Sequence, residues 1–198
     1  MTTSVDPNTG QLTYATTTNK KGKPVAQVAT DSNGKQIGSK AARKKLMKAI
    51  GNKKTLNVFA SSKTNSVGGG LQMNLNSGQI NDFIKGTSSD LDSRTMGFGM
   101  TFLHELTHTD IGGNLSDPQT TTLPNGSKVV PFGQTGATVN FMNTVRGQLN
   151  QQGGNFGTRT SYGKMPINGL FYVPFSTKSS GLIQRGIVPA TERVETTK

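Results

Sequence analysis

The two histidines of this 198-residue chain constrain its fold more than any other feature, because they stand four residues apart in the segment His104-Glu-Leu-Thr-His108. On an α-helix, residues four apart project from one face, one turn from each other. Leu103 and Leu106 would line another side of the same helix and bury it. The spacing therefore predicts a buried helix over residues 92–109 that presents two imidazoles together.

Two imidazoles at this spacing can occupy two of the tetrahedral positions around Zn²⁺. Glu105 follows about 100° further round the helix, so it would lie beside the metal ion rather than bind it. There its carboxylate could take a proton from the attacking water and later pass that proton to a leaving amine. We therefore expect His104 and His108 to bind zinc and Glu105 to act as the general base. The alternative is a pair of structural histidines or a site that has lost its function.

A third zinc ligand cannot be a histidine or a cysteine, because the chain has no further His and no Cys. The next Glu after the motif is Glu192, so the candidates are aspartates or a tyrosine. Asp110 comes two residues after the motif and would point away unless the helix had already ended. Asp117 follows a pair of glycines at 112–113, which can reverse the chain. We expect Asp117 to be the third ligand, although Asp before Pro is also a common start of a turn.

Two further segments could complete a cleft beside the motif helix. Arg159 and Tyr162, three residues apart in a glycine-flanked loop, could both stabilise a tetrahedral oxyanion. Residues 71–76 alternate apolar and polar side chains as a half-exposed strand does. The preceding glycines favour a bend that leads into an edge strand, and they lack the Lys-Ser/Thr of a phosphate-binding loop. An extended peptide could pair with this edge. The candidate substrate-binding residues are Leu71, Gln72, Met73 and Asn74.

Positive charge is concentrated in the first part of the chain. Residues 1–54 carry a net charge of +9, whereas residues 55–198 carry +3. We divide the chain there into a basic, turn-rich N-terminal segment, with short strands and one helix over residues 39–50, and a second domain. A basic face is typical of proteins that bind nucleic acids or anionic surfaces. No aromatic residue between Lys20 and Lys54 could stack on bases, which weighs against nucleic acid, and a solvated helix face is the simpler explanation.

The composition excludes several classes of protein. A chain without cysteine has no disulfide scaffold and no thiolate nucleophile. No apolar run reaches the 18 or so residues of a membrane-spanning helix. The N-terminus lacks the basic and apolar regions of a classical signal peptide, so any export would use another route. Hydrophobic residues make up 31% of the chain, and 25 glycines accompany them, which predicts a modest core with many turns.

The sequence resembles the small H-E-x-x-H zinc metallopeptidase domains found as secreted bacterial effectors and at the C-terminal tips of Rhs-type polymorphic toxins. The Arg159-x-x-Tyr162 pair is similar to that of clostridial neurotoxin light chains. The resemblance implies zinc binding by the two histidines, activation of water by Glu105, and transition-state stabilisation by Arg159 and Tyr162. It is carried by five segments within residues 67–166: 68–75, 102–109, 112–118, 139–146 and 159–162.

Together these features predict an α+β, zincin-like fold, in which a small twisted sheet packs on the motif helix and a second helix covers residues 136–151. The expected function is that of a zinc-dependent endopeptidase acting on a protein or peptide. The resemblance implies a bacterial toxin or effector, secreted or delivered into a target cell by a non-classical route, with a cognate immunity protein as a further partner. The alternatives are a basic nucleic-acid- or anionic-surface-binding module with a structural or vestigial metal site, and a metal-dependent hydrolase of non-peptide bonds.

Overall fold

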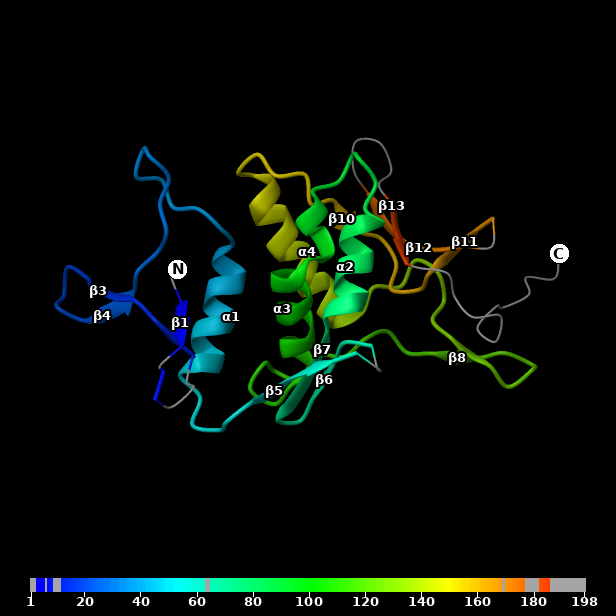
Figure 1. The fold of residues 1–198 in the computed structure, drawn as a ribbon, viewed down its shortest axis with the longest axis horizontal. Helices are drawn as coiled ribbons and strands as arrows, with labels where there is room; N and C mark the ends of the chain where they lie inside the picture. The colour runs from blue at the N-terminus through cyan, green and yellow to red at the C-terminus, as the bar shows by residue number, and fades with distance from the viewer. Residues whose placement is uncertain are drawn as a thin grey trace.

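The computed structural model describes residues 3–5, 7–8, 12–62, 65–168, 170–176 and 182–185. Over these residues the chain is a mixed α+β structure, in which four α-helices pack with several small sheets (Figure 1). The α+β class predicted from the sequence is thus confirmed. The helical elements are α1 (Lys40–Ile50), α2 (Ser77–Lys85), the 3₁₀ turn η1 (Ser93–Met96), α3 (Phe98–His108) and α4 (Gly136–Asn150). The strands are β1 (Thr3–Val5), β2 (Leu12–Tyr14), β3 (Thr16–Thr18), β4 (Pro24–Ala26), β5 (Asn57–Ser61), β6 (Val67–Gly69), β7 (Gln72–Asn76), β8 (Thr121–Thr122), β9 (Lys128–Val129), β10 (Thr158–Arg159), β11 (Met165–Ile167), β12 (Leu170–Ser176) and β13 (Leu182–Arg185).

A three-stranded sheet holds the motif helix α3 in place. Its order is β5-β7-β6, with β7 parallel to β5 and antiparallel to β6. Strand β6 crosses α3 so closely that a Cβ atom on Gly68 would lie 2.1 Å from the carbonyl oxygen of Glu105. Met73 of the middle strand is fully buried in one core with Leu103 and Leu106 of α3. The depth of the motif helix is therefore fixed by a glycine contact on one strand and a methionine on the next.

The prediction that residues 71–74 form an open edge is wrong. Gln72, Met73 and Asn74 pair with β5 on one side and with β6 on the other. Leu71, just before the strand, packs against the same core as Met73. Alternation of apolar and polar residues identifies a strand and its faces, but it says nothing about how many neighbours the strand has. In the described part of the chain the edges of this sheet are β5 and β6, and β6 is the one that lies on α3.

Helices α1, α3 and α4 form the main core together with this sheet (Figure 1). Its fully buried or nearly buried side chains on α3 and α4 include Leu106 and Met142. Ser39 caps α1 by accepting a hydrogen bond from the backbone N–H of Ala42, and its hydroxyl donates to Gln148 of α4 at 2.7 Å. Helix α1 belongs to the N-terminal segment of our division at residue 54, and it shares this core with the helices beyond that boundary.

A second, smaller core lies between α2 and the sheet around β12. Strand β12 pairs with β10, β11 and β13, and all three pairings are antiparallel. Strand β12 is the longest of these four strands and contributes buried side chains from its second half. The buried members of this core are Phe83, Leu91, Val173, Phe175 and Ile183.

None of the described helices combines the length and the apolar character needed to cross a membrane.

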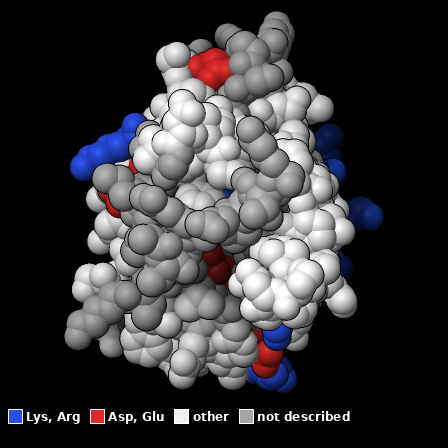
Figure 2. Space-filling view, turned by 90° about the vertical axis from the view of Figure 1, so that its right-hand side faces the viewer, with Lys and Arg blue, Asp and Glu red and all other residues white. Residues whose placement is uncertain are grey.

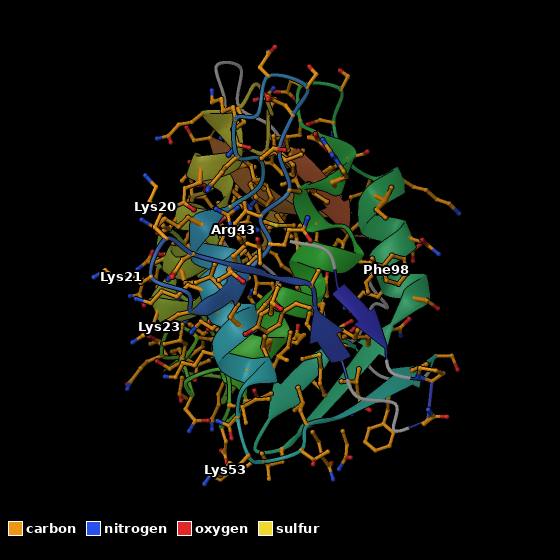
Figure 3. The ribbon with its side chains drawn as sticks, turned by 90° about the vertical axis from the view of Figure 1, so that its left-hand side faces the viewer. Lys20, Lys21, Lys23, Arg43, Lys53 and Phe98 are labelled. Carbon is orange, nitrogen blue, oxygen red and sulfur yellow. The ribbon has the colours of Figure 1, made fainter. Side chains whose placement is uncertain are left out.

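The basic residues of the N-terminal segment are spread over several elements. Figure 3 shows Lys20, Lys21 and Lys23 projecting from the β3–β4 hairpin, and Lys53 beyond the end of α1. Arg43 lies on α1, where its guanidinium donates hydrogen bonds to two backbone carbonyls of the loop before that helix. Part of the positive charge seen in the sequence is therefore used within the protein.

Candidate metal centre

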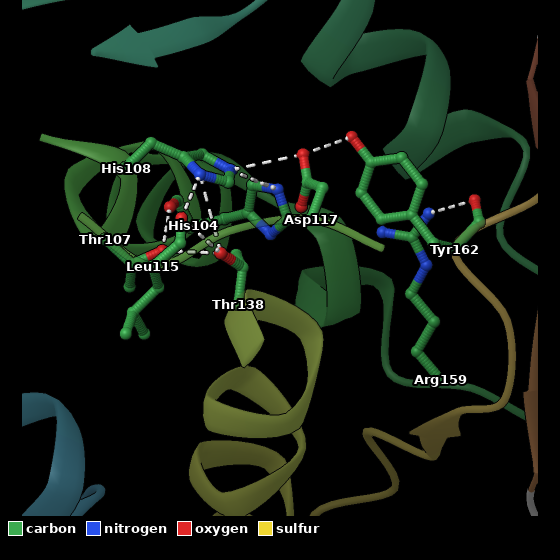
Figure 4. A network of polar contacts seen from close by, with 8 residues as sticks. All are labelled: His104, Thr107, His108, Leu115, Asp117, Thr138, Arg159 and Tyr162. Atoms are coloured by element: carbon green, nitrogen blue, oxygen red, sulfur yellow. Dashed lines mark hydrogen bonds and ion pairs between the residues drawn. The ribbon is translucent and has the colours of Figure 1, made fainter. Parts of the chain in front are cut away.

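The structure brings His104, His108 and Asp117 together, and one possible ligand atom from each lies within 4.8 Å of the other two (Figure 4). Nε2 of His108 is 3.4 Å from Nε2 of His104 and 3.6 Å from Oδ2 of Asp117. Two ligand atoms on a tetrahedral ion with zinc-like bond lengths are about 3.3–3.4 Å apart. Both separations are close to this value, so the three residues could hold one metal ion.

The ring of His108 is oriented by a backbone carbonyl. Its Nδ1 lies 2.7 Å from the carbonyl oxygen of Leu115, to which it donates a hydrogen bond. That bond places the ring proton on Nδ1 and leaves the lone pair of Nε2 directed at His104 and Asp117. Thr138, at the start of α4, donates to the same carbonyl oxygen at 3.3 Å. A second layer of contacts therefore holds this imidazole in the form that binds a metal ion.

Asp117 contains the clearest sign that a cation belongs here. Its Oδ2 accepts a 2.6 Å hydrogen bond from the hydroxyl of Tyr162, whereas its Oδ1 is buried and has no hydrogen-bond partner among the described residues. Buried carboxylate oxygens are nearly always paired, because an unpaired one loses its hydration without replacement. Two imidazoles and one carboxylate are also a common ligand set for a catalytic divalent ion. The residues present therefore fit a divalent metal ion.

Close backbone contacts return Asp117 to the histidines. Helix α3 ends at His108, and the chain then folds back so tightly that a Cβ atom on Gly112 would lie 1.5 Å from the carbonyl oxygen of Leu106. Gly136, with φ at +69°, lies against the Asp117–Pro118 peptide, where a Cβ atom would be 2.6 Å from the proline ring. The reversal predicted at the glycine pair therefore occurs, and the first residue of α4 supports its far end.

Asp110, the other candidate for the third ligand, faces away from the histidines. Its carboxylate pairs with Lys54 at 3.2 Å, and its backbone N–H donates to the carbonyl of Gly70. In the same turn Lys45 of α1 donates to the carbonyl oxygen of Gly112 at 2.6 Å. Both lysines come from the basic N-terminal segment, so that segment helps to hold the loop that leads to Asp117.

Glu105 lies between strand β6 and a cavity. Its side chain is 8% exposed, and its carboxylate accepts a hydrogen bond from the backbone N–H of Gly68. Burial raises the pKa of the Glu105 carboxyl to about 7, and the negative charge of Asp117 contributes to the increase. A carboxyl group with a pKa near neutrality can both accept and return a proton at physiological pH.

Arg159 and Tyr162 meet at the same cavity, as the sequence predicted for a shared cleft. The Arg159 guanidinium is buried, donates to the carbonyls of Ser161 and Tyr162, and lies 4.9 Å from the centre of the Tyr162 ring. Burial, followed by the hydrogen bond to Asp117, raises the pKa of Tyr162, so its hydroxyl stays protonated and can donate. Burial and the positive charge of Arg159 hold the pKa of His104 well below its usual range, which keeps this ring neutral.

The cavity has a volume of about 180 Å³ and connects these groups. Figure 2 shows the face on the right-hand side of Figure 1, where a hollow near the centre has acidic atoms at its floor. The described residues that line the cavity with charged or metal-binding groups are His104, Glu105, Arg146, Arg159, Tyr162 and Lys164.

Asn143 and Arg146 of α4 also lie beside the catalytic candidates, although their sequence positions predicted no role for them. The Asn143 side chain accepts hydrogen bonds from the Arg159 backbone N–H at 2.9 Å and from Arg146 at 3.1 Å. Its amide also donates to the carbonyl of Arg159. Helical spacing alone could have placed Asn143 and Arg146 near one face of α4, but only the packing of β10 against that face shows what they contact.

No protein-family model matches the chain, and no curated protein or solved structure matches it either.

Proposed function

We propose that this protein is a zinc-dependent endopeptidase with a zincin-like arrangement of helix, sheet and cavity. One observation carries the proposal: His104, a member of the three-residue metal-binding group, lines a cavity together with the buried Glu105, Arg159 and Tyr162. Each of these residue types has a separate task in the hydrolysis of a peptide bond. Their convergence from α3, the loop that follows it, strand β10 and the segment after β10 favours a catalytic role over a structural one.

Zn²⁺ held by His104, His108 and Asp117 would polarise the scissile carbonyl and make water a stronger nucleophile. Glu105 takes a proton from the attacking water as the new C–O bond forms. It then gives that proton to the nitrogen of the leaving amine as the C–N bond breaks, so the carboxylate is regenerated. The hydrogen bond from Gly68 keeps the Glu105 side chain directed towards the cavity between the two proton transfers.

Tyr162 supplies a hydrogen-bond donor for the oxyanion. Its hydroxyl donates to Asp117 at 2.6 Å, and Tyr162 also lines the cavity; in the proposed mechanism the hydroxyl turns from Asp117 to the oxyanion. Arg159 carries a buried positive charge beside the ring and holds the Tyr162 backbone through its carbonyl. Positive charge and a neutral donor at this point stabilise developing negative charge.

An extended substrate would pair with strand β6 rather than β7. Strand β6 is an edge of its sheet and lies directly on α3. A peptide added antiparallel or parallel to this edge would pass over Glu105 and the metal group. This replaces the sequence-based assignment of the substrate edge to residues 71–74.

The direct test compares the wild-type chain with Glu105→Gln, which keeps the size of the side chain but cannot take up a proton. Both proteins are loaded with Zn²⁺ and incubated with a cell lysate, and new peptide N-termini are identified by amine labelling and mass spectrometry. We expect the wild type to generate a reproducible set of new N-termini and the variant to generate at most about 1% as many, since general base catalysis contributes 10²–10⁴-fold.

Asp110→Asn is the matched control, because it changes a carboxylate of the same loop that contacts Lys54 and not the metal group. It should cleave like the wild type. Equal cleavage by the wild type and Glu105→Gln, at equal zinc content, would contradict the role of Glu105, and no cleavage by the wild type would contradict the endopeptidase proposal.

The proposed biological setting, a bacterial toxin or effector opposed by an immunity protein, is supported by the sequence resemblance alone. The alternative of a basic nucleic-acid- or surface-binding module has less support. Arg43, Lys45 and Lys54 are engaged in contacts within the protein. The binding-module alternative would be favoured if the protein bound DNA or vesicles with a steep salt dependence and lost this binding when Lys44 and Lys48 were changed.

A further inference from the structure

Arg146 is a buried cation that has no anionic partner among the described residues. Its side chain is 3% exposed, and its Nη1 donates to the side-chain oxygen of Asn143. The opposite edge of the guanidinium carries a buried Nε that has no hydrogen-bond partner among the described residues. The Cζ atom of the guanidinium lies over the Phe175 ring, 5.1 Å from its centre. One edge of the buried guanidinium therefore carries a hydrogen-bond donor that has no partner among the described residues.

The charges around Arg146 make this arrangement costly without a ligand. The ion pairs within the described residues do not include Arg146. Burial, and after it the nearby positive charge of Arg159, lowers the pKa of Arg146 to about 9. The cavity is lined by three cationic side chains, Arg146, Arg159 and Lys164, against one carboxylate, that of Glu105. A buried charge that is neither paired nor solvated is strongly unfavourable, so the cavity is suited to an anionic group.

We propose that this cavity binds the side-chain carboxylate of an Asp or Glu residue of the substrate, next to the bond that is cleaved, and that Arg146 is its main ligand. This inference rests on the endopeptidase proposal and names the substrate class of the same site. His104 and Glu105 line the same cavity, so a side chain held there lies beside the reacting groups.

The size and geometry of the cavity favour a single carboxylate. Its volume of about 180 Å³ is below the roughly 300–1,000 Å³ of pockets that enclose a whole small-molecule ligand. A planar carboxylate matches two parallel N–H groups on one edge of a guanidinium. The Nε edge of Arg146 offers such a pair, whereas a phosphate group carries more charge and more acceptor oxygens than one edge can satisfy.

The first test uses fluorescence-quenched peptides built on a sequence that the wild-type protein cleaves in the lysate experiment. In one series the residue on each side of the scissile bond is Glu, and in a second series it is the isosteric Gln. We expect Glu at one of these positions to raise kcat/KM at least tenfold over Gln, mainly through a lower KM. Cleavage without any preference for Glu or Asp would overturn the inference and leave the endopeptidase proposal standing.

The variant Arg146→Met then tests whether Arg146 binds the carboxylate of the substrate. The Glu-to-Gln ratio of kcat/KM should fall to about one, and Arg146→Lys should restore part of it. A purely structural role would instead lower both rates by the same factor and leave the ratio unchanged. Zinc content and the melting temperature of each variant show whether it is folded.

A binding measurement separates this inference from catalysis. The buried Nε–H of Arg146 is followed by ¹⁵N NMR. Its signal is assigned by its loss in Arg146→Lys, a variant that has no Nε–H. N-acetyl-glutamate amide is then added to the Zn²⁺-loaded wild type. We expect a saturable shift of that signal, and no shift with N-acetyl-glutamine amide. No shift with the carboxylate, or a larger and tighter effect of inorganic phosphate or a phosphoserine peptide, would overturn the assignment even if the protein cleaves no peptide.

Discussion

Asp117 is the residue on which the metal centre depends most, since it alone comes from outside the motif helix. Its carboxylate lies against His108 on one side and Tyr162 on the other, and one of its oxygens is buried without a partner among the described residues. Asp117→Ala should therefore lose zinc, with the metal content after dialysis falling below about 0.1 per chain. Elemental analysis of the purified protein measures this directly.

The comparison variant is Asp110→Ala, which removes a carboxylate from the same loop that faces Lys54. It should retain one zinc per chain. Equal zinc content in the two variants would show that Asp117 is not the third ligand.

Tyr162 contacts the same carboxylate but has a separate task in the proposed mechanism. Tyr162→Phe removes the hydroxyl that donates to Asp117 while the ring keeps its contact with Arg159. If the hydroxyl stabilises the oxyanion, kcat should fall by about 10²-fold, with little change in KM, because the bond is made only in the transition state. Steady-state kinetics on a quenched peptide measures both parameters. A fall in zinc content that accounts for the whole loss of activity would assign Tyr162 to positioning Asp117 instead.

At the scale of elements, the crossing of β6 over α3 fixes the place of Glu105. A Cβ atom at Gly68 would overlap the backbone of Glu105, whereas one at the neighbouring Gly69 would meet nothing within 4 Å. Gly68→Ala should therefore lower the free energy of unfolding by about 1–3 kcal/mol, as overpacking does. It should also reduce activity, since the strand must move away from the helix. Urea unfolding of both variants measures the difference.

Gly69→Ala is the matched control on the same strand, and it should change stability by less than about 0.5 kcal/mol. Similar losses in the two variants would mean that the contact with Glu105 does not decide the effect.

Local patterns predicted the helices better than they predicted the sheet. The helices expected over residues 39–50 and 136–151 agree with α1 and α4 to within one residue. The helix expected over residues 92–109 is interrupted at Gly97, where ψ of 179° separates η1 from α3. Helix α2 was not predicted, although Asn76 caps it and Ile80 and Phe83 have helical spacing. Strand β7 was recognised, but its two neighbours depend on pairing between distant segments.

In the site, too, residues that are close in the sequence could be predicted to lie together, whereas contacts between distant segments could not. His104, Glu105 and His108 lie within one helical turn, so their spacing alone places them together. Asp117 could be predicted from the glycine pair before it, because glycines permit a tight reversal. The roles of Asn143 and Arg146 could not, since the hydrogen bonds between Asn143 and Arg159 require α4 to pack against β10. The proposed preference for a substrate carboxylate depends on these distant contacts, which the sequence alone does not reveal.

At the scale of the whole molecule, metal binding should contribute to stability, because its three ligands connect α3 to the loop that α1 and α4 hold in place. Zn²⁺ at 100 times its dissociation constant adds about 2.7 kcal/mol to the free energy of unfolding. For a domain of this size that corresponds to a rise in Tm of about 5–11 °C. Thermal unfolding followed by circular dichroism, with and without excess chelator, measures the shift. Asp117→Ala should show a much smaller rise and Asp110→Ala the full one, whereas a wild-type Tm that is insensitive to both Zn²⁺ and chelator would contradict a metal centre that joins these elements.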